Sequence, residues 1–435
     1  MPRASEVVGR YRWLICGLLF IGTSINYIDR QILSLLKPIL DEQLHWTNEE
    51  YGRVNAAFQG SYAVGLLLFG AFVDRFGTKI GYAVSIGAWS LAALGHGLVG
   101  SVGGFFRARV LLGVSEGGNF PSAIKAVALW FPKSERAFAT ALFNSGANVG
   151  AILAPAIVPF VAAKWGWQSA FILAGAIGLL FLLLWLPFYD LPEKVRRLSS
   201  RELAHIRADN DEPSQSDESA RGGAVQWLSL LRHRQAWSFI VCKLLTDPVW
   251  WFFLIWLPDY FKKTRGLDLK ASWVHLVSIY AIVTVLSIVG GWLTGYLTKR
   301  GFSPTGARKT AMFCFAQCVL PILFVTKAGD WSAVVLIGLA GAAHQAWSAN
   351  LFTTVSDMFP KRAVASVVGI GGMAGSLGGI AFPILAGKLL DHFQAAGDIT
   401  AGYGILFGFC GFAYLFAFGI SHALAPRFAP VEGSI

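Results

Sequence analysis

Long apolar stretches separated by short polar segments follow one another along almost the whole chain. A helix needs about 20 apolar residues to span a lipid bilayer. Twelve stretches of this kind occur among the 435 residues, and they lie at about 12–30, 51–73, 79–99, 102–130, 137–162, 168–188, 236–261, 272–298, 308–327, 332–358, 364–390 and 402–425. The pattern predicts an all-α integral membrane protein with twelve transmembrane helices.

One polar segment, residues 191–235, interrupts this pattern in the middle of the chain. It contains the run DNDEPSQSDESARGG at 209–223, whose low hydrophobicity and high charge are typical of a partly disordered linker. Six predicted spans precede this segment and six follow it. The sequence therefore predicts an N-terminal six-helix bundle at 1–190, a cytoplasmic linker at 191–235 and a C-terminal six-helix bundle at 236–435.

The two predicted bundles resemble each other in sequence. Six residues of the first half recur 228 residues later in the second half. They are Phe131, Pro132, Lys133, Ala137, Gly150 and Pro155, which recur as Phe359, Pro360, Lys361, Ala365, Gly378 and Pro383. An internal duplication of this kind is typical of transporters, whose substrate binds near the middle of the membrane between the repeats.

The composition agrees with a membrane protein and explains the basic charge. Hydrophobic residues make up 55% of the chain and charged residues 14%, whereas a soluble domain carries roughly 25% charged residues. With the N-terminus inside, 22 of the 36 Lys and Arg residues fall on cytoplasmic segments. This asymmetry follows the positive-inside rule, so the net charge of +11 requires no nucleic acid partner. We expect a multi-pass protein of the cell inner membrane with both termini in the cytoplasm.

Charged side chains inside the first and fourth predicted spans are the main candidates for function. Asp29 and Arg30 belong to the first span, and Arg109 and Glu116 belong to the fourth. A charge at the middle of a bilayer costs about 2.5–3.5 kcal/mol on insertion scales, and such residues usually mark an ion or substrate path. Arg109 and Glu116 are seven residues apart and share a helix face, although they are too far apart for direct contact. The charges predict transport of a charged solute.

A conspicuous motif follows the second span. The segment GAFVDRFGTKIGY at 70–82 resembles the signature loop between spans two and three of the major facilitator superfamily. This resemblance implies two pseudo-symmetric six-helix bundles. It also implies that a group of loop residues latches neighbouring helices on the cytoplasmic side, namely Gly70, Asp74, Arg75 and Lys79. The alternative interpretation is an ordinary basic loop.

Further segments narrow the resemblance to the anion:cation symporter branch of this superfamily. They are NYIDR at 26–30, RVLLGVSEGGNFP at 109–121, WFPKSERAFATALFNSGANVGAILAP at 130–155 and AHQAWSANLFTTVSD at 343–357. TDPVWWFFLIWLP at 246–258 and GTKIGYA at 77–83 are most similar to hexuronate carriers within the branch. The resemblance implies uptake of an organic anion, such as a hexuronate or an aldonate, by proton symport and alternating access. It implies no cofactor, since the proton gradient is the driving force.

The first bundle carries most of the expected binding and coupling residues. The forked guanidinium of Arg30 matches a carboxylate, unless it is an interface residue that snorkels outward. The resemblance places Tyr27 and Tyr62 beside it, with interhelical packing as the alternative for Tyr62. It assigns proton coupling to Glu116 and Asp29, with Arg109 as the neighbouring cation. Some hexuronate carriers lack an acid at the position of Asp29, and a fixed ion pair between helices is the alternative for both acids.

The remaining candidates for substrate binding are Asn144, Trp251, Gln345 and Ser348. An aldonate carrier would place a glutamine near position 147, and Asn144 is the nearest replacement, unless it only bonds to another helix. Trp251 suits stacking on a sugar face, but tryptophan is also common in interface belts. Gln345 and Ser348 belong to a polar cluster in the tenth predicted span.

The sequence contains neither the GxxxxGK[ST] loop of ATP-driven proteins nor the HExxH motif of metalloproteases, and we expect neither an enzyme nor a metal site. The partners that we expect are a small organic anion, a proton and membrane lipid, and we expect a monomer. The same scaffold is also compatible with transport of an aldonate, glucarate or an aromatic acid such as phthalate. A membrane receptor or enzyme that inherited the scaffold is a further alternative.

Overall fold

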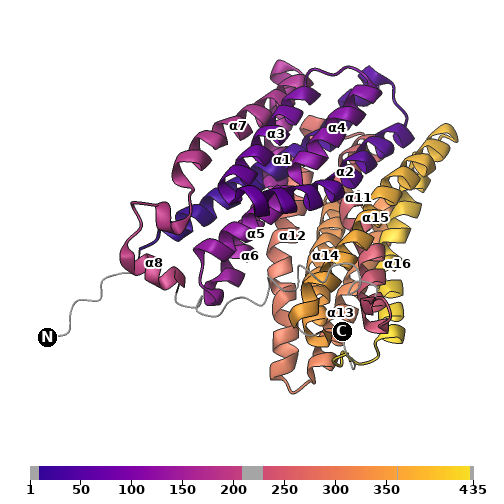
Figure 1. Cartoon of the computed structure of the whole chain (residues 1–435). Helices are drawn as coiled ribbons and strands as arrows, with labels where there is room; N and C mark the ends of the chain where they lie inside the picture. Colours follow the sequence, from indigo (N-terminus) through magenta and orange to yellow (C-terminus); the bar gives the residue numbers. More distant parts are fainter. Residues whose placement is uncertain (1–8, 208–228, 360, 432–435) are drawn as a thin grey trace. The chain divides into compact units, whose positions relative to one another are not determined.

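The computed structural model describes residues 9–207, 229–359 and 361–431, and Figure 1 shows that these residues form helices joined by short connections. The helices, in chain order, are α1 (Tyr11–Leu44), α2 (Asn48–Phe76), α3 (Thr78–His96), α4 (Val102–Glu116), α5 (Asn119–Trp130), α6 (Lys133–Trp165), α7 (Trp167–Phe188), η1 (Pro192–Lys194), α8 (Ser200–Arg207), α11 (Arg234–Arg265), α12 (Leu269–Lys299), α13 (Pro304–Val319), η2 (Leu320–Lys327), α14 (Asp330–Met358), α15 (Lys361–Ala395) and α16 (Ile399–Leu424). Each of the twelve predicted spans is helical. Eight helical segments among the described residues are long and apolar enough to cross a membrane by length and composition.

The first predicted span, at 12–30, is too short. α1 continues to Leu44, so Arg30 lies in the interior of the helix and not at its end. The helix continues through Lys37 and Pro38. Lys37 can remain there because its ammonium group is paired with Asp259 of α11.

The described residues belong to two compact units. The first unit comprises residues 1–33 and 60–214, and the second comprises residues 34–59 and 215–435. α1 therefore begins in the first unit and ends in the second, and α2 begins in the second and ends in the first. The predicted linker run at 209–223 lies outside the described residues, and the predicted boundaries at 190 and 235 stay predictions.

The beginning of the predicted linker is helical and is docked on the first unit. The carboxylate of Glu202 on α8 accepts hydrogen bonds from the backbone N–H groups of Tyr11 and Arg12, at 3.2 and 3.1 Å. A carboxylate at a helix N-terminus is stabilised by the helix dipole. The Arg12 side chain also pairs with Glu135 of α6 at 2.8 Å and holds the pKa of that carboxyl below its usual value. α8 thus connects the starts of α1 and α6.

A buried polar network holds residues 34–59 within the second unit. Lys37 is 1% exposed, and its ammonium nitrogen lies 2.8 Å from Asp259 Oδ1 and 2.7 Å from Asp41 Oδ2. Tyr403 of α16 donates a hydrogen bond to the other oxygen of Asp259 at 2.6 Å. A buried lysine without a partner would be strongly destabilising. The end of α1 is therefore fixed to α11 and α16.

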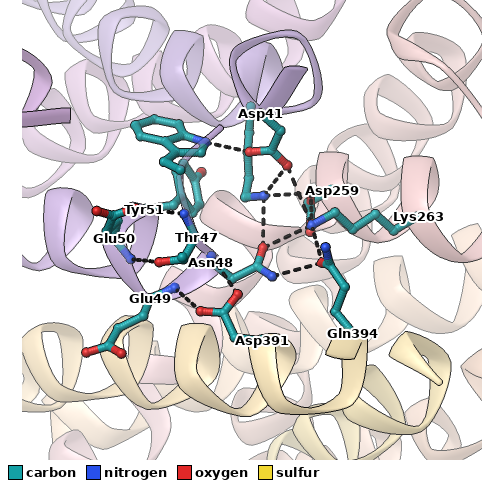
Figure 2. A network of polar contacts seen from close by, with 12 residues as sticks. Asp41, Thr47, Asn48, Glu49, Glu50, Tyr51, Asp259, Lys263, Asp391 and Gln394 are labelled. Atoms are coloured by element: carbon teal, nitrogen blue, oxygen red, sulfur yellow. Dashed lines mark hydrogen bonds and ion pairs between the residues drawn. The ribbon is translucent and has the colours of Figure 1, made fainter. Parts of the chain in front are cut away.

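The start of α2 is fixed in the same unit. Figure 2 shows Asp391 of α15 directed at the first turn of α2. Its two oxygens accept hydrogen bonds from the backbone N–H groups of Asn48 and Glu49, both at 2.8 Å. The N-terminal N–H groups of a helix have no partner within the helix, and a carboxylate there satisfies them. This contact anchors the beginning of α2 on α15.

The sequence repeat corresponds to a structural repeat. α6 begins at Lys133 and α15 begins at Lys361, which is 228 residues later. Gly150 on α6 lies so close to α1 that a Cβ atom would be 2.5 Å from the Ser24 carbonyl oxygen. Its repeat, Gly378 on α15, lies against α11, where a Cβ atom would be 2.8 Å from the Leu244 carbonyl oxygen. The repeated glycine therefore permits the same kind of close helix crossing in each unit.

We expect Gly150→Ala to destabilise the protein, because α1 and α6 would have to move apart to accommodate the methyl group. Overpacking of this kind costs typically about 1–3 kcal/mol. The apparent melting temperature of the purified protein in detergent should fall. Gly17→Ala on α1 is the control, because its methyl group would meet no atom of the described residues within 4 Å. Equal melting temperatures for the two variants would contradict the importance of this crossing.

Candidate functional site

An ion pair between α1 and α4 forms the centre of the candidate site in the first unit. Arg30 Nε donates to Glu116 Oε2 at 2.6 Å. The Glu116 side chain is fully buried, and the Arg30 side chain is 8% exposed. Neither charge could be buried alone without a large penalty, because the membrane interior cannot solvate it. Two residues that are 86 positions apart are thus held together in the interior of the unit.

The helix that carries Glu116 ends at this residue. The predicted span at 102–130 is formed by two consecutive helices, since α4 ends at Glu116 and α5 begins at Asn119. Gly117 and Gly118 separate the two helices, and glycine is a poor helix former. The C-terminus of a helix is the negative end of its dipole, where a carboxylate is unfavourable. Glu116 therefore depends on the positive charge of Arg30 more than a carboxylate in a helix interior would.

Two aromatic rings flank the guanidinium group. Arg30 Cζ lies 4.9 Å from the centre of the Tyr27 ring and 4.5 Å from the centre of the Tyr62 ring. A guanidinium at this distance is attracted by the negative face of an aromatic ring. The structure thus brings together Tyr27, Arg30 and Tyr62 as the family resemblance implies, and their role in substrate binding stays a prediction.

Arg109 reaches across to α1. It is 1% exposed, and its Nη2 donates to the backbone carbonyl of Arg30 at 3.3 Å. Its position two helical turns before Glu116 places a second buried cation near the ion pair, without direct contact expected between the two side chains. The carboxylate of Glu116 therefore finds its direct partner on another helix, which the sequence spacing could not indicate.

Asp29 is the second acid of the group. It is 2% exposed, and neither of its carboxylate oxygens has a hydrogen-bond partner among the described residues. An ionised carboxylate that is buried without donors would cost several kcal/mol, whereas the neutral acid avoids most of this penalty. The environment of Asp29 therefore suits a group that holds a proton.

The other candidates for substrate binding lie elsewhere. Asn144 on α6 belongs to the first unit and has an exposed side chain. Trp251 on α11 and Gln345 and Ser348 on α14 belong to the second unit and are partly exposed. Their roles in binding stay predictions.

The predicted latch residues surround the end of α2. Lys79 Nζ lies 2.9 Å from Asp190 Oδ2, just beyond α7, and both side chains are about one-third exposed, at 36% and 35%. Arg75 is exposed and lies over the Phe76 ring, and a Cβ atom at Gly70 would meet open space among the described residues. The side chain of Asp74 lies outside the described residues. The sequence pattern did not identify Asp190, and the latch itself stays a prediction.

Two buried lysines were also missed from the sequence pattern. Lys37 of α1 and Lys243 of α11 are 1% and 7% exposed. Both lie within long helices and pair with carboxylates of α11, Asp259 and Asp247 respectively. The signal for Lys243 was present, since a lysine inside the predicted span at 236–261 is itself unusual. The described residues contain no group of three or more His, Cys, Asp or Glu side chains that could hold a metal ion.

We expect the partners of the ion pair to differ in how much their removal destabilises the protein. Arg30→Gln leaves Glu116 buried at the negative end of α4, whereas Glu116→Gln leaves Arg30 between two aromatic rings. Breaking a buried pair costs about 3–5 kcal/mol when the remaining charge is left uncompensated. Arg30→Gln should therefore lower the apparent melting temperature more than Glu116→Gln.

The double variant Arg30→Gln/Glu116→Gln should melt at a higher temperature than Arg30→Gln alone, because Glu116 no longer leaves a buried negative charge without its direct partner. A double variant that is less stable than either single variant would show that the two side chains act independently.

The chain is similar to known proteins over most of its length. A model of the Major Facilitator Superfamily matches residues 19–383. The hexuronate transporter of Escherichia coli (strain K12) is 30% identical over 400 residues, which is 91% of this chain and 90% of that protein. The D-galactonate transporter of Escherichia coli O6:H1 is 30% identical over 404 residues, which is 91% of this chain and 93% of that protein.

A solved structure supports the fold. It is a bacterial homologue of the human lysosomal transporter Spinster in an inward-facing and unoccupied conformation. It matches with a TM-score of 0.77 at 16% identity and covers 97% of this chain and 99% of that chain. This likeness, together with the family match, confirms the predicted all-α fold of twelve transmembrane helices.

Proposed function

Because the chain belongs to the Major Facilitator Superfamily, we propose that it is a secondary active transporter that imports an organic anion together with protons. Membership in this family makes it a multi-pass membrane transporter and not an enzyme. The observation that carries the proposal is the buried ion pair between Arg30 and Glu116 at 2.6 Å. A cation that is already balanced by a protonatable acid can exchange that acid for the carboxylate of a substrate.

The exchange couples the two solutes. When Glu116 takes up a proton, its negative charge disappears and the Arg30 guanidinium becomes available to a substrate carboxylate. The anion and the proton therefore favour the same state of the protein, and each raises the affinity for the other. Asp29 is a second site for a proton, and Arg109 adds positive charge near both acids. The driving force is the proton gradient, without a cofactor.

The substrate that we propose is a hexuronate, glucuronate or galacturonate. Support comes from the hexuronate transporter among the relatives and from the segment TDPVWWFFLIWLP in α11. The D-galactonate transporter has the same 30% identity, so overall identity does not separate a hexuronate from an aldonate. Glucarate and aromatic acids such as phthalate are further candidates for the substrate. The charged residues Asp29, Arg30 and Glu116, which the chain retains inside its spans, favour a transporter over a non-transporting receptor.

In this proposal Arg30 holds the carboxylate of the substrate, and the other contacts come from Tyr27, Tyr62, Asn144, Trp251, Gln345 and Ser348. Gly70, Asp74, Arg75 and Lys79 regulate the change between inward-open and outward-open states. The protein works as a monomer in the inner membrane, with both termini in the cytoplasm.

Uptake into proteoliposomes tests the proposal. Radiolabelled glucuronate, galacturonate, galactonate and glucarate are offered with an inward proton gradient, with an inward sodium gradient and with neither. We expect glucuronate and galacturonate to accumulate only with the proton gradient. Accumulation driven by sodium would overturn the coupling, and accumulation of galactonate or glucarate alone would overturn the choice of substrate.

We expect Glu116→Gln to uncouple transport from the proton gradient. The amide keeps the shape of the side chain but cannot release a proton, so exchange of labelled for unlabelled substrate continues while gradient-driven accumulation is lost. Both activities are measured in the same proteoliposomes, with Asp29→Asn as the parallel variant. If Glu116→Gln accumulates substrate normally and Asp29→Asn does not, Asp29 is the coupling acid and the assignment to Glu116 is wrong.

Arg30→Lys should weaken substrate binding while keeping the positive charge. Lysine lacks the planar fork that binds a carboxylate through two parallel hydrogen bonds. A hydrogen bond to a charged group contributes about 1.5–3 kcal/mol, which corresponds to roughly a 10- to 150-fold increase in Kd. Isothermal titration in detergent measures this change. The exposed Arg107, changed to Lys, is the control, and an unaltered affinity in Arg30→Lys would exclude Arg30 as the anchor.

A further inference from the structure

Three side chains of different chemistry lie along one face of α11. Lys243, Asp247 and Trp251 are spaced four residues apart, so they follow one another on consecutive turns of the same helix face. Lys243 Nζ lies 2.7 Å from Asp247 Oδ2. The Lys243 side chain is 9% exposed and that of Asp247 is 18% exposed. We call Lys243, Asp247 and Trp251 the α11 stripe.

Two glycines of the neighbouring helix α15 lie against the α11 stripe. A Cβ atom at Gly375 would lie 2.1 Å from Asp247 Oδ2, and a Cβ atom at Gly379 would lie 3.1 Å from Trp251 Cδ1. The two glycines therefore leave space for the carboxylate and for the indole ring. α11 and α15 could pack at least as closely if Asp247 were a small apolar residue, so close packing alone does not explain a carboxylate here.

The other surroundings of the stripe are aromatic. Lys243 Nζ lies 4.7 Å from the centre of the Phe352 ring of α14. The adjacent Trp250 ring stacks on His344, with 5.5 Å between the ring centres, and His344 Nδ1 lies 2.6 Å from Tyr414 OH. An aromatic ring of α14 thus lies against the ammonium group of the stripe, and rings of α11, α14 and α16 contact one another in the same unit.

The ion pair of the stripe does not join two helices. Lys243 and Asp247 both belong to α11, unlike the Arg30–Glu116 and Lys37–Asp259 pairs, which connect different helices. Burying an ion pair gives little net stability compared with apolar residues of the same volume. A role in holding the fold together therefore gives a poor account of its position.

The chemistry of the stripe matches a hydroxylated ligand. A carboxylate accepts hydrogen bonds from hydroxyl groups, and an ammonium group donates up to three. The broad indole ring of tryptophan offers an apolar surface, with one polar N–H at its edge. A sugar ring presents the complementary groups, namely neighbouring hydroxyls and an apolar face of C–H bonds. An aromatic acid or a short sulfonate would leave Asp247 without a hydroxyl partner.

We propose that Lys243, Asp247 and Trp251 bind the hydroxyl groups and the apolar face of the substrate, and that they make this protein selective for polyhydroxylated acids. The inference rests on the proposed transport of an organic anion and deepens it. Asp247 accepts from hydroxyls, Lys243 donates to hydroxyl oxygens while it orients Asp247, and Trp251 packs against the ring. Gly375 and Gly379 are positioning residues, since they leave space for the carboxylate and the indole.

A cycle of protein variants and substrate analogues tests the proposal. Dissociation constants of glucuronate and its monodeoxy analogues are measured by isothermal titration for the wild type, for Asp247→Asn and for a control, Asp357→Asn. Asp357 is a half-buried acid of the same unit that pairs with Arg308. In the wild type and the control, loss of at least one hydroxyl should raise Kd by 10-fold or more. In Asp247→Asn, loss of that same hydroxyl should raise Kd less than 3-fold.

If Asp247 had only a structural role, its substitution would change the dissociation constants of all ligands by a similar factor. If loss of each hydroxyl raises Kd by the same factor in Asp247→Asn as in the wild type, the α11 stripe does not bind the hydroxyl groups and the inference is wrong. Should Asp247→Asn fail to fold because Lys243 is left unpaired, the neutral double variant Lys243→Gln/Asp247→Asn provides the same comparison, with the same two outcomes.

Binding measurements on the wild type alone distinguish a failure of this inference from a failure of the proposed function. Binding of phthalate or sulfoacetate as tightly as any hydroxylated acid would overturn the hydroxyl selectivity but leave organic-anion transport intact. Absence of binding and uptake for every organic acid in the panel would overturn the proposed function, and the inference with it.

Discussion

A charge buried in a transmembrane helix needs a partner, and much of the structure is arranged around this constraint. Arg30 and Glu116 join α1 to α4, and Lys37 and Asp259 join α1 to α11. Each pair brings together helices that are distant in sequence, because the lipid cannot solvate either charge. The same helix, α1, thus carries one cation whose partner lies in the first unit and another whose partner lies in the second.

The need to neutralise buried charges also underlies the coupling that we propose between the anion and the proton. An ion pair is one way to neutralise Arg30, and a protonated Glu116 together with a bound organic anion is another. Both arrangements have the same net charge, so the exchange that we propose would leave no isolated charge exposed to the membrane.

The sequence predicted the spans well, because the length of an apolar stretch is a local property. It did not predict where α1 ends, since the predicted span ends at Arg30, and only the folded chain shows that Arg30 and Lys37 have partners on α4 and α11. Likewise, the sequence marked Arg30 and Glu116 as unusual, but only the folded chain shows that they are each other's partners. Lys243 carried the same signal and was overlooked. The binding roles of Trp251, Gln345 and Ser348 stay predictions, because a partly exposed side chain in a helix has the same local pattern whether it packs or binds.

The most direct test of this account is the number of protons that the protein takes up when it binds its substrate. Purified protein in weakly buffered detergent solution is mixed with glucuronate near neutral pH, and the change in pH is recorded for the wild type and for Glu116→Gln. The account predicts proton uptake with each anion bound by the wild type, and none by Glu116→Gln, although this variant still binds the substrate. Equal proton uptake by both proteins would contradict the exchange between Glu116 and the substrate carboxylate.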